Sequence, residues 1–284
     1  MNALFLMIAM LLLCAQEIAQ KEYGKRARGG AYTYALIAVF AAIIVFLITS
    51  GGKLEFRWDV AVYSMLFALG YCTAMVTMLQ AIRTGSLSLS ALIMQYSLIV
   101  PAIYGMTVLG EPVKATLFIG IALLVVSLFL VNFNASEKTV RPTLRWAIYI
   151  GLTFIGNGMC ATVQKVQQVD FDGAYKSEFM LVGLAVTAVI LIVLTLIFER
   201  RDLAYNVRHG GLICAGSGFA NGGCNFLIMV LEGLMPASIM YPVICAGATL
   251  VTMLVAFVIY RERMSRQQII GIVLGIFAII ALNI

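Results

Sequence analysis

Two apolar hairpins, built to the same plan, constrain this chain more than any other feature of its sequence. Residues 85–132 hold two long apolar runs joined by a very short turn, and residues 236–283 repeat this arrangement. A shift of 151 residues superposes three pairs: Glu111 on Glu262, Gly120 on Gly271 and Asn132 on Asn283. A repeat of this length is a unit of architecture, so we expect one helical hairpin to be used twice.

The composition places these hairpins in a membrane. Hydrophobic residues make up 62% of the chain and charged residues only 11%, against roughly 45–50% and 25% in soluble domains. A helix crosses the hydrocarbon layer with about 20 apolar residues, and such runs take up nearly the whole sequence. The first run lacks the basic start and the small-residue cleavage site of a signal peptide, so it is interpreted as a span. We therefore expect an all-α integral membrane protein with no compact soluble domain.

Ten transmembrane helices can be marked along the chain. They are expected near residues 2–20, 31–50, 60–82, 86–109, 113–132, 144–165, 176–198, 209–231, 234–259 and 267–284. The only polar connection of any length, Asn134–Pro142, divides them into two groups of five. An odd number of spans makes the second group enter from the opposite face, so the two groups form an inverted pair. The predicted repeats are residues 1–133 and 143–284.

The basic residues predict the orientation. The loops on one side carry 14 of the 19 lysines and arginines, and those on the other side carry 5. Basic loops stay in the cytoplasm, so both termini are expected outside it, in a multi-pass protein of the plasma or inner membrane. The net charge of +6 is explained by these loops and does not predict a nucleic-acid partner.

The hairpins resemble the EamA-type domain of the drug/metabolite transporter superfamily. The resemblance is carried by Tyr241-Pro242 inside a span, Glu262 at its end, and Gln267 followed by Gly271, with Pro101, Glu111 and Gly120 as a looser counterpart. It covers the whole chain. Members of this family are similar in being ten-span secondary transporters of metabolites, amino acids, sugars or drugs, with a central cavity. Many are drawn with cytoplasmic termini, and the basic loops of this chain predict the opposite.

Polar side chains inside spans are the candidates for a substrate site, because lipid offers them no partner. The first span carries Gln16 and Glu17, and Glu17 is the only acidic residue well inside a span. It is interpreted either as a cavity-lining or proton-coupling group, or as the i,i+4 partner of Lys21, a pair that contributes only about 0.2–0.5 kcal/mol.

Three asparagines extend this set. Asn157 is in the sixth span, and Asn221 and Asn225 are four residues apart in the eighth, so the latter two share a helix face. Four glycines around them are consistent either with a ligand cavity and a locally weakened helix or with close helix packing. Aromatic and amide groups complete the candidate substrate-binding residues: Tyr71, Gln95, Tyr96 and Tyr241.

Other polar groups are interpreted as structural. Glu111 and Glu262 are expected to cap turns or pair with loop cations, and Lys165 to reach the interface from the end of its span. Gly271 and Gly275 are expected to pack within the molecule. The six cysteines lie in apolar runs without metal-ligand spacing, so no metal or other cofactor is expected.

A secondary transporter working by alternating access is the function that these features favour. Its substrate is expected to be small and neutral, zwitterionic or weakly cationic, because so few charges lie inside spans, with a coupling proton or ion as a further partner. A membrane channel or an accessory subunit is the alternative. An enzyme is not expected, because one loop histidine and one embedded carboxylate form no catalytic constellation. Either a monomer or a homodimer fits the sequence.

Overall fold

The computed structural model describes residues 2–28, 30–84, 87–111, 115–132, 143–258 and 265–283, which are helical apart from short connections. The expected turn residue Glu262 lies outside these ranges. The helices are α1 (Asn2–Arg26), α2 (Ala31–Thr49), α3 (Trp58–Thr84), α4 (Leu87–Tyr96), α5 (Ile99–Thr107), α6 (Ala115–Asn132), α7 (Leu144–Asp170), α8 (Lys176–Phe198), α9 (Leu203–Glu232), α10 (Ala237–Val258) and α11 (Arg266–Asn283).

Seven of these helices are long and apolar enough to cross a membrane: α1, α2, α3, α7, α8, α9 and α10. Three shorter apolar helices accompany them, at Leu92–Thr107, Ala115–Val131 and Arg266–Leu282. The chain is therefore an α-helical, multi-pass membrane protein. The expected span 86–109 is the one that differs in kind, because it consists of two helices, α4 and α5.

The helices form two compact units. Unit 1 comprises Met1–Cys72 and Val166–Gly233, and unit 2 comprises Thr73–Lys165 and Leu234–Ile284. Each unit takes helices from both halves of the sequence, and α3 and α7 contribute residues to both. These units are defined by contacts in space. The two repeats at 1–133 and 143–284 are a division of another kind and stay a prediction.

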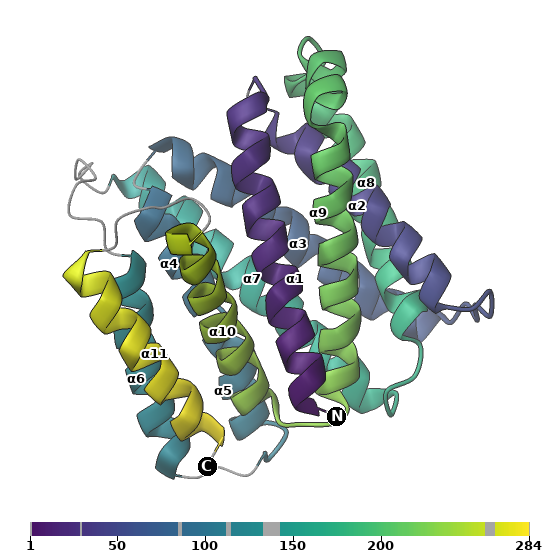
Figure 1. Ribbon diagram of the computed structural model, residues 1–284. Helices are drawn as coiled ribbons and strands as arrows, with labels where there is room; N and C mark the ends of the chain where they lie inside the picture. Colours follow the sequence, from purple (N-terminus) through teal and green to yellow (C-terminus); the bar gives the residue numbers. More distant parts are fainter. Residues whose placement is uncertain are drawn as a thin grey trace. The chain divides into compact units, whose positions relative to one another are not determined.

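Unit 1 is built on the pairs α1–α9, α2–α9 and α2–α8 (Figure 1). The small residues of α9 make the α2 contact close: a side chain at Gly218 would collide with the backbone of Ala38, and one at Gly222 would lie 3.0 Å from Cα of Ala42. Gly218 and Gly222 thus serve packing. α9 continues through the glycines of the eighth span without interruption, and the locally weakened helix stays a prediction.

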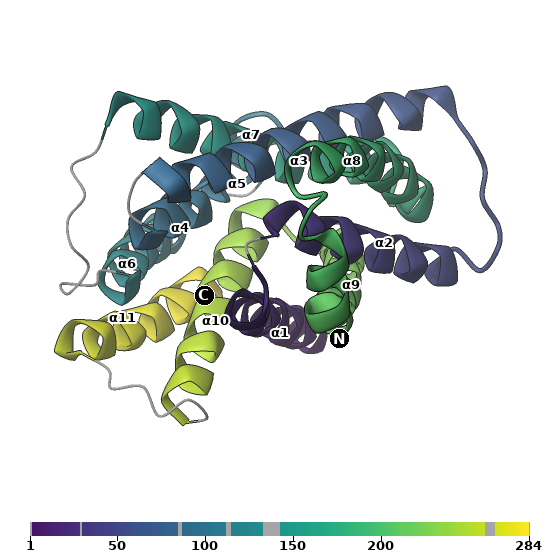
Figure 2. The same ribbon diagram turned by 90° about the horizontal axis from the view of Figure 1, so that it is seen from above.

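Unit 2 is built on the α6–α11 pair, with α10 against α5, α6 and α11 (Figure 2). Gly120 of α6 faces Leu282 of α11, and Gly271 of α11 faces Val131 of α6. Gly275 also faces α6, at Oγ of Ser127. The expectation that Gly271 and Gly275 pack within the molecule is confirmed.

Candidate functional site

The break between α4 and α5 interrupts an apolar run among the residues that the structure describes. Pro101 has no amide hydrogen and its ring clashes with the carbonyl four residues earlier, that of Ser97. The amides of Ser97, Leu98 and Val100 instead bond carbonyls three residues back, at 3.1, 3.3 and 3.0 Å. The chain therefore passes from α4 to α5 through a tight, non-α turn in the middle of the segment.

A polar pair from another helix lies at this break. Asn157 of α7 donates its amide to Oγ of Ser97 at 2.7 Å, and Ser97 donates in turn to the carbonyl of Met94 at 2.5 Å. The next residue, Gly158, lets α7 approach closely, since a Cβ there would lie 3.2 Å from the carbonyl oxygen of Ser97. The predicted site residue Asn157 is thus placed at the broken helix.

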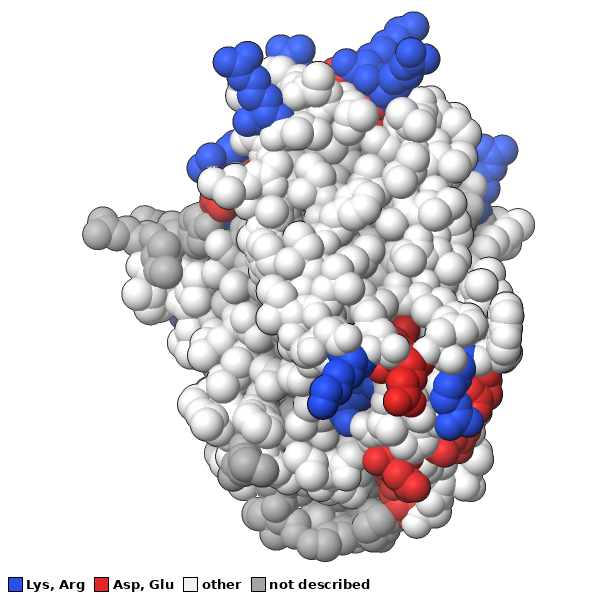
Figure 3. Space-filling model, turned by 90° about the vertical axis from the view of Figure 1, so that its right-hand side faces the viewer, with Lys and Arg blue, Asp and Glu red and all other residues white. Residues whose placement is uncertain are grey.

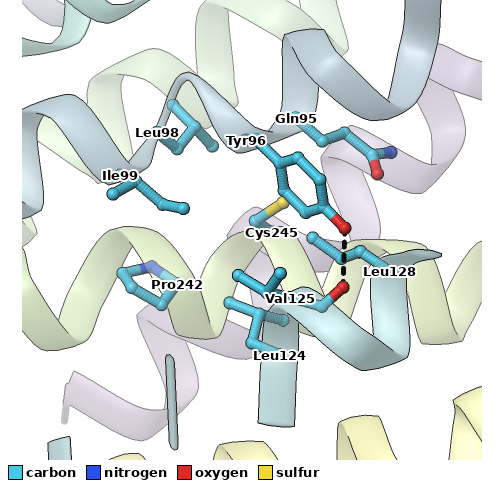
Figure 4. A pocket seen from close by; sticks show the side chains of 9 residues that line it. All are labelled: Gln95, Tyr96, Leu98, Ile99, Leu124, Val125, Leu128, Pro242 and Cys245. Carbon is cyan, nitrogen blue, oxygen red and sulfur yellow. Dashed lines mark hydrogen bonds between the residues drawn. The ribbon is translucent and has the colours of Figure 1, made fainter. Parts of the chain in front are cut away.

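Gln95 and Tyr96, two further predicted site residues, end α4 just before the break. They line a small cavity with apolar side chains of α5, α6 and α10: Leu98, Ile99, Leu124, Val125, Leu128, Pro242 and Cys245 (Figure 4). The Tyr96 hydroxyl donates to the carbonyl of Val125 at 2.6 Å. At about 10 Å³, the cavity is at the lower limit for one water molecule, so a ligand could enter only if the helices around it moved.

Tyr241 belongs to the same unit and is buried. Its hydroxyl donates to the carbonyl of Ala161 on α7 at 3.0 Å. This bond ties α10 to α7, four residues beyond Asn157. The structure thus gives Tyr241 a packing role and places it near the break through its partner helix.

The amides of α1 and α9 form a separate cluster in unit 1. Asn221 donates to Oε1 of Gln16 at 3.0 Å, and Asn225 donates to the carbonyl and the side-chain oxygen of Asn221 at 2.9 and 3.2 Å. The shared face predicted for the two asparagines is confirmed. Their contact with Gln16, 205 residues away in the sequence, could not be predicted from spacing.

Glu17 and Tyr71 are the other predicted site residues of unit 1. Glu17 is exposed on α1, as is Lys21 one turn later, so its two interpretations stay predictions. Tyr71 of α3 is half-buried and stacks on Phe67, with ring centroids 5.8 Å apart. The predicted site residues therefore fall into two groups, one in each unit.

A buried ion pair in unit 2 was missed at the sequence level. Nζ of Lys165 lies 3.3 Å from Oε1 of Glu111 and donates to the carbonyl of Met235 at 3.4 Å. Lys165 is buried, not extended to the interface as expected. Burying a charged pair carries a large desolvation penalty, which further hydrogen bonds to the charged groups help to offset.

Glu111 also caps the start of α10. Its carboxylate oxygens accept the amides of Ala237 and Ser238 at 2.8 and 3.0 Å. Gly105 makes room for the carboxylate, because a Cβ there would collide with Oε2. Burial alone raises the pKa of Glu111, but the amides of Ser238 and Ala237 and the charge of Lys165 together hold it below its ordinary value. Glu111 was expected to cap its own turn or to pair with a loop cation. It instead caps α10, a helix from the other half of the chain, and pairs with Lys165 of α7.

Unit 1 has a counterpart that sequence reasoning also missed. Glu199, just after α8, accepts the amides of Tyr32 and Thr33 at 3.0 and 2.8 Å and the Thr33 hydroxyl at 2.8 Å. It therefore caps α2 as Glu111 caps α10.

Two more buried polar side chains lie at the end of α7, where the side-chain amide of Gln168 donates to the side-chain oxygen of Gln167.

Comparison with known proteins bears on the fold alone. No family model and no curated protein matches this sequence. A solved structure described as "Crystal structure of protein" is similar, with a TM-score of 0.83 at 12% identity over 99% of this chain and 95% of that one. At that identity the likeness is one of fold alone. No cluster of metal-ligating side chains occurs among the residues that the structure describes.

Proposed function

We propose that this protein is a secondary active transporter of a small neutral, zwitterionic or weakly cationic metabolite or drug, working by alternating access in the plasma or inner membrane. In this proposal the three shorter apolar helices also cross the bilayer, so that there are ten spans in two inverted five-helix repeats. α6, with 18 residues, extends about 27 Å, close to the roughly 30 Å thickness of the hydrocarbon layer.

The α6–α11 contact supports the inverted repeat. Gly120 faces Leu282, and Gly271 faces Val131. Adding 151 residues to Gly120 and to Val131 gives Gly271 and Leu282, so the two contacts exchange when the halves are exchanged. Two-fold related surfaces make reciprocal contacts of this kind. The registers of the two hairpins therefore agree with a pseudo-two-fold axis between α6 and α11.

The broken helix α4–α5 is the observation that carries the transport proposal. Backbone that departs from the α-helix at membrane depth is tolerated where it is buried in protein or lines a cavity, and discontinuous helices are a recurring feature of transporter binding sites. Here the break brings together Gln95, Tyr96, Ser97 and Asn157 in unit 2.

The neutral character of these groups supports the proposed class of substrate. Amide and hydroxyl groups bind polar ligands without demanding a charge. The charges Glu111 and Lys165, in the same unit, lie 3.3 Å apart and compensate each other, so neither offers a full charge to a ligand. A polyanion would have no uncompensated cation to bind among the side chains at the break.

The test begins with a thermal-shift screen of the purified protein against a metabolite library, because a ligand that prefers the folded state raises its stability. A stabilising compound is then followed in proteoliposomes by counterflow. We expect saturable exchange that Asn157→Ala reduces and Thr162→Ala, also on α7, leaves unchanged. Thr162 is a matched control because its hydroxyl bonds only its own helix at Gly158, at 2.8 Å.

Two results would contradict the proposal. Electrogenic flux at channel-like rates without counterflow would indicate a channel. A protein that no library compound stabilises and that shows no counterflow with those compounds would favour an accessory subunit.

A further inference from the structure

Exposed cations gather at one end of unit 1, where α1 ends and α8 passes into α9. They are Lys25, Arg26, Arg28, Arg200, Arg201 and Arg208. Figure 3 shows lysine and arginine side chains gathered at the upper end of the molecule, beyond a broad uncharged band. Three acids lie nearby, so the six cations outnumber them: Glu22 pairs with Lys25 at 2.6 Å, Glu199 is buried against α2, and Asp202 directly precedes α9.

At this end of the unit, which we call the platform, hydrogen bonds and ring packing join the segment after α1 to the start of α9. The Tyr23 hydroxyl donates to the carbonyl of Gly30 at 2.8 Å, and Oδ1 of the buried Asn206 accepts the backbone amide of Arg28 at 3.0 Å. Gly210 of α9 lets the Tyr23 ring pack directly on it. The chain that follows α1 is thereby fixed onto the first two turns of α9, and Arg28 with it.

The side chain of Arg28 is held in turn by an aromatic stack. Its guanidinium lies 4.3 Å from the ring centroid of Tyr205, and that ring stacks on His209 with centroids 4.0 Å apart. Stacking engages the flat face of a guanidinium and leaves its N–H edge for a planar or tetrahedral anion. Arg208 lies three residues after Tyr205 on α9. A second guanidinium side chain therefore begins within one helical turn of this stack.

The length of α9 indicates the depth at which these cations lie. Its 30 residues extend about 45 Å, whereas the hydrocarbon layer is about 30 Å thick, so the helix must project into a headgroup region. Leu212 is 90% exposed one turn after Arg208, and Phe198 is 65% exposed two residues before Arg200. Arg200 and Arg208 thus lie within about one helical turn of exposed side chains suited to contact acyl chains.

We propose that this platform binds the phosphate headgroups of anionic phospholipids through Arg28, Arg200, Arg201 and Arg208. Basic groups just outside a membrane helix attract anionic lipids, whose phosphates they pair with at the surface. Exposed apolar side chains next to the cations favour a lipid over a nucleic acid or a free phosphate, because only a lipid has chains to cover them. The inference is independent of transport.

The test is native mass spectrometry of the full-length protein in detergent with equal amounts of phosphatidylglycerol and phosphatidylcholine. The wild type should retain phosphatidylglycerol preferentially. Each cation at a membrane surface contributes about fivefold in affinity, so the variant Arg28→Gln, Arg200→Gln, Arg208→Gln should reduce the preference at least tenfold. The control variant Lys53→Gln, Arg145→Gln, Arg266→Gln removes three exposed cations elsewhere and should keep it.

Circular dichroism and gel filtration of both triple variants establish that they are folded before they are compared. An equal loss of preference in the two variants would show that total charge alone attracts the lipid, and would overturn the proposal. So would an unchanged preference in the first variant. Displacement of phosphatidylglycerol by excess glycerol 3-phosphate would identify a site for free phosphate esters instead of lipid.

Discussion

Nζ of Lys165 and Oε1 of Glu111 lie 3.3 Å apart with both side chains buried, at 6% and 9% exposure. The pair joins the turn after α5 to α7, and the amides of Ala237 and Ser238 bring in the start of α10. Three segments of unit 2 therefore converge on one carboxylate. Glu111 keeps two amide donors when the lysine is removed. Substituting Lys165 and substituting Glu111 should therefore change the free energy of unfolding by different amounts.

Lys165→Met should destabilise unit 2 substantially. Removing one partner of a buried ion pair typically costs about 3–5 kcal/mol, and the two remaining amide donors on Glu111 place the expected loss near 3 kcal/mol. The measurement is denaturant or thermal unfolding in detergent, with Lys53→Met at an exposed lysine as the control. The double variant Glu111→Gln, Lys165→Met should lose less than the sum of the single losses, and strict additivity would contradict the coupling.

Glu111 should also make stability depend on pH in a defined window. Its folded-state pKa is lowered from 4.5, so the folded state favours the ionised form and the unfolded state binds the proton first. The stabilisation is fully present above pH 4.5 and is lost as the pH falls through the folded-state pKa. The difference in unfolding temperature between the wild type and Glu111→Gln should stay constant from about pH 8 to 5 and shrink below that.

The control for this pH series is Glu55→Gln, which changes an exposed carboxylate. It should remain close to the wild type at every pH. A difference for Glu111→Gln that grows toward acid pH would mean that the carboxylate is destabilised by folding, against its amide and lysine contacts.

The orientation of the chain can be tested at its C-terminus. With 14 basic residues in the loops of one side and 5 in those of the other, both termini should lie outside the cytoplasm. Alkaline phosphatase fused after Ile284 should therefore be active, because it folds only outside the cytoplasm, and a green fluorescent protein fusion should stay dark. A fluorescent fusion would reverse the orientation.

The helices were predictable and the contacts were not, for a physical reason. Each of the ten apolar runs contains helix among the described residues, because hydropathy over about 20 residues is a local property. Whether a proline breaks its helix depends on the surroundings: the chain is interrupted before Pro101, whereas α10 continues through Pro242.

The partners of the site residues depend on the tertiary structure in the same way. Asn221 contacts Gln16 across 205 residues, and Glu111 contacts Lys165 across 54 positions of the chain. An isolated sequence supplies the polar groups and the helix faces they occupy, and folding decides which groups meet. Candidate side chains could therefore be named in advance, whereas their grouping into a broken-helix site and an amide cluster could not.

Two glycines of α9, two residues apart, should respond in opposite ways to the same substitution. A Cβ at Gly218 would collide with the backbone of Ala38 in α2, whereas a Cβ at Gly216 meets nothing within 4 Å. Gly218→Ala should destabilise unit 1 by about 1–3 kcal/mol, because overpacking forces the helices apart. Gly216→Ala should stabilise it by up to about 1 kcal/mol through helix propensity. Unfolding in detergent measures both, and equal effects would mean that α2 and α9 are not in close contact at Gly218.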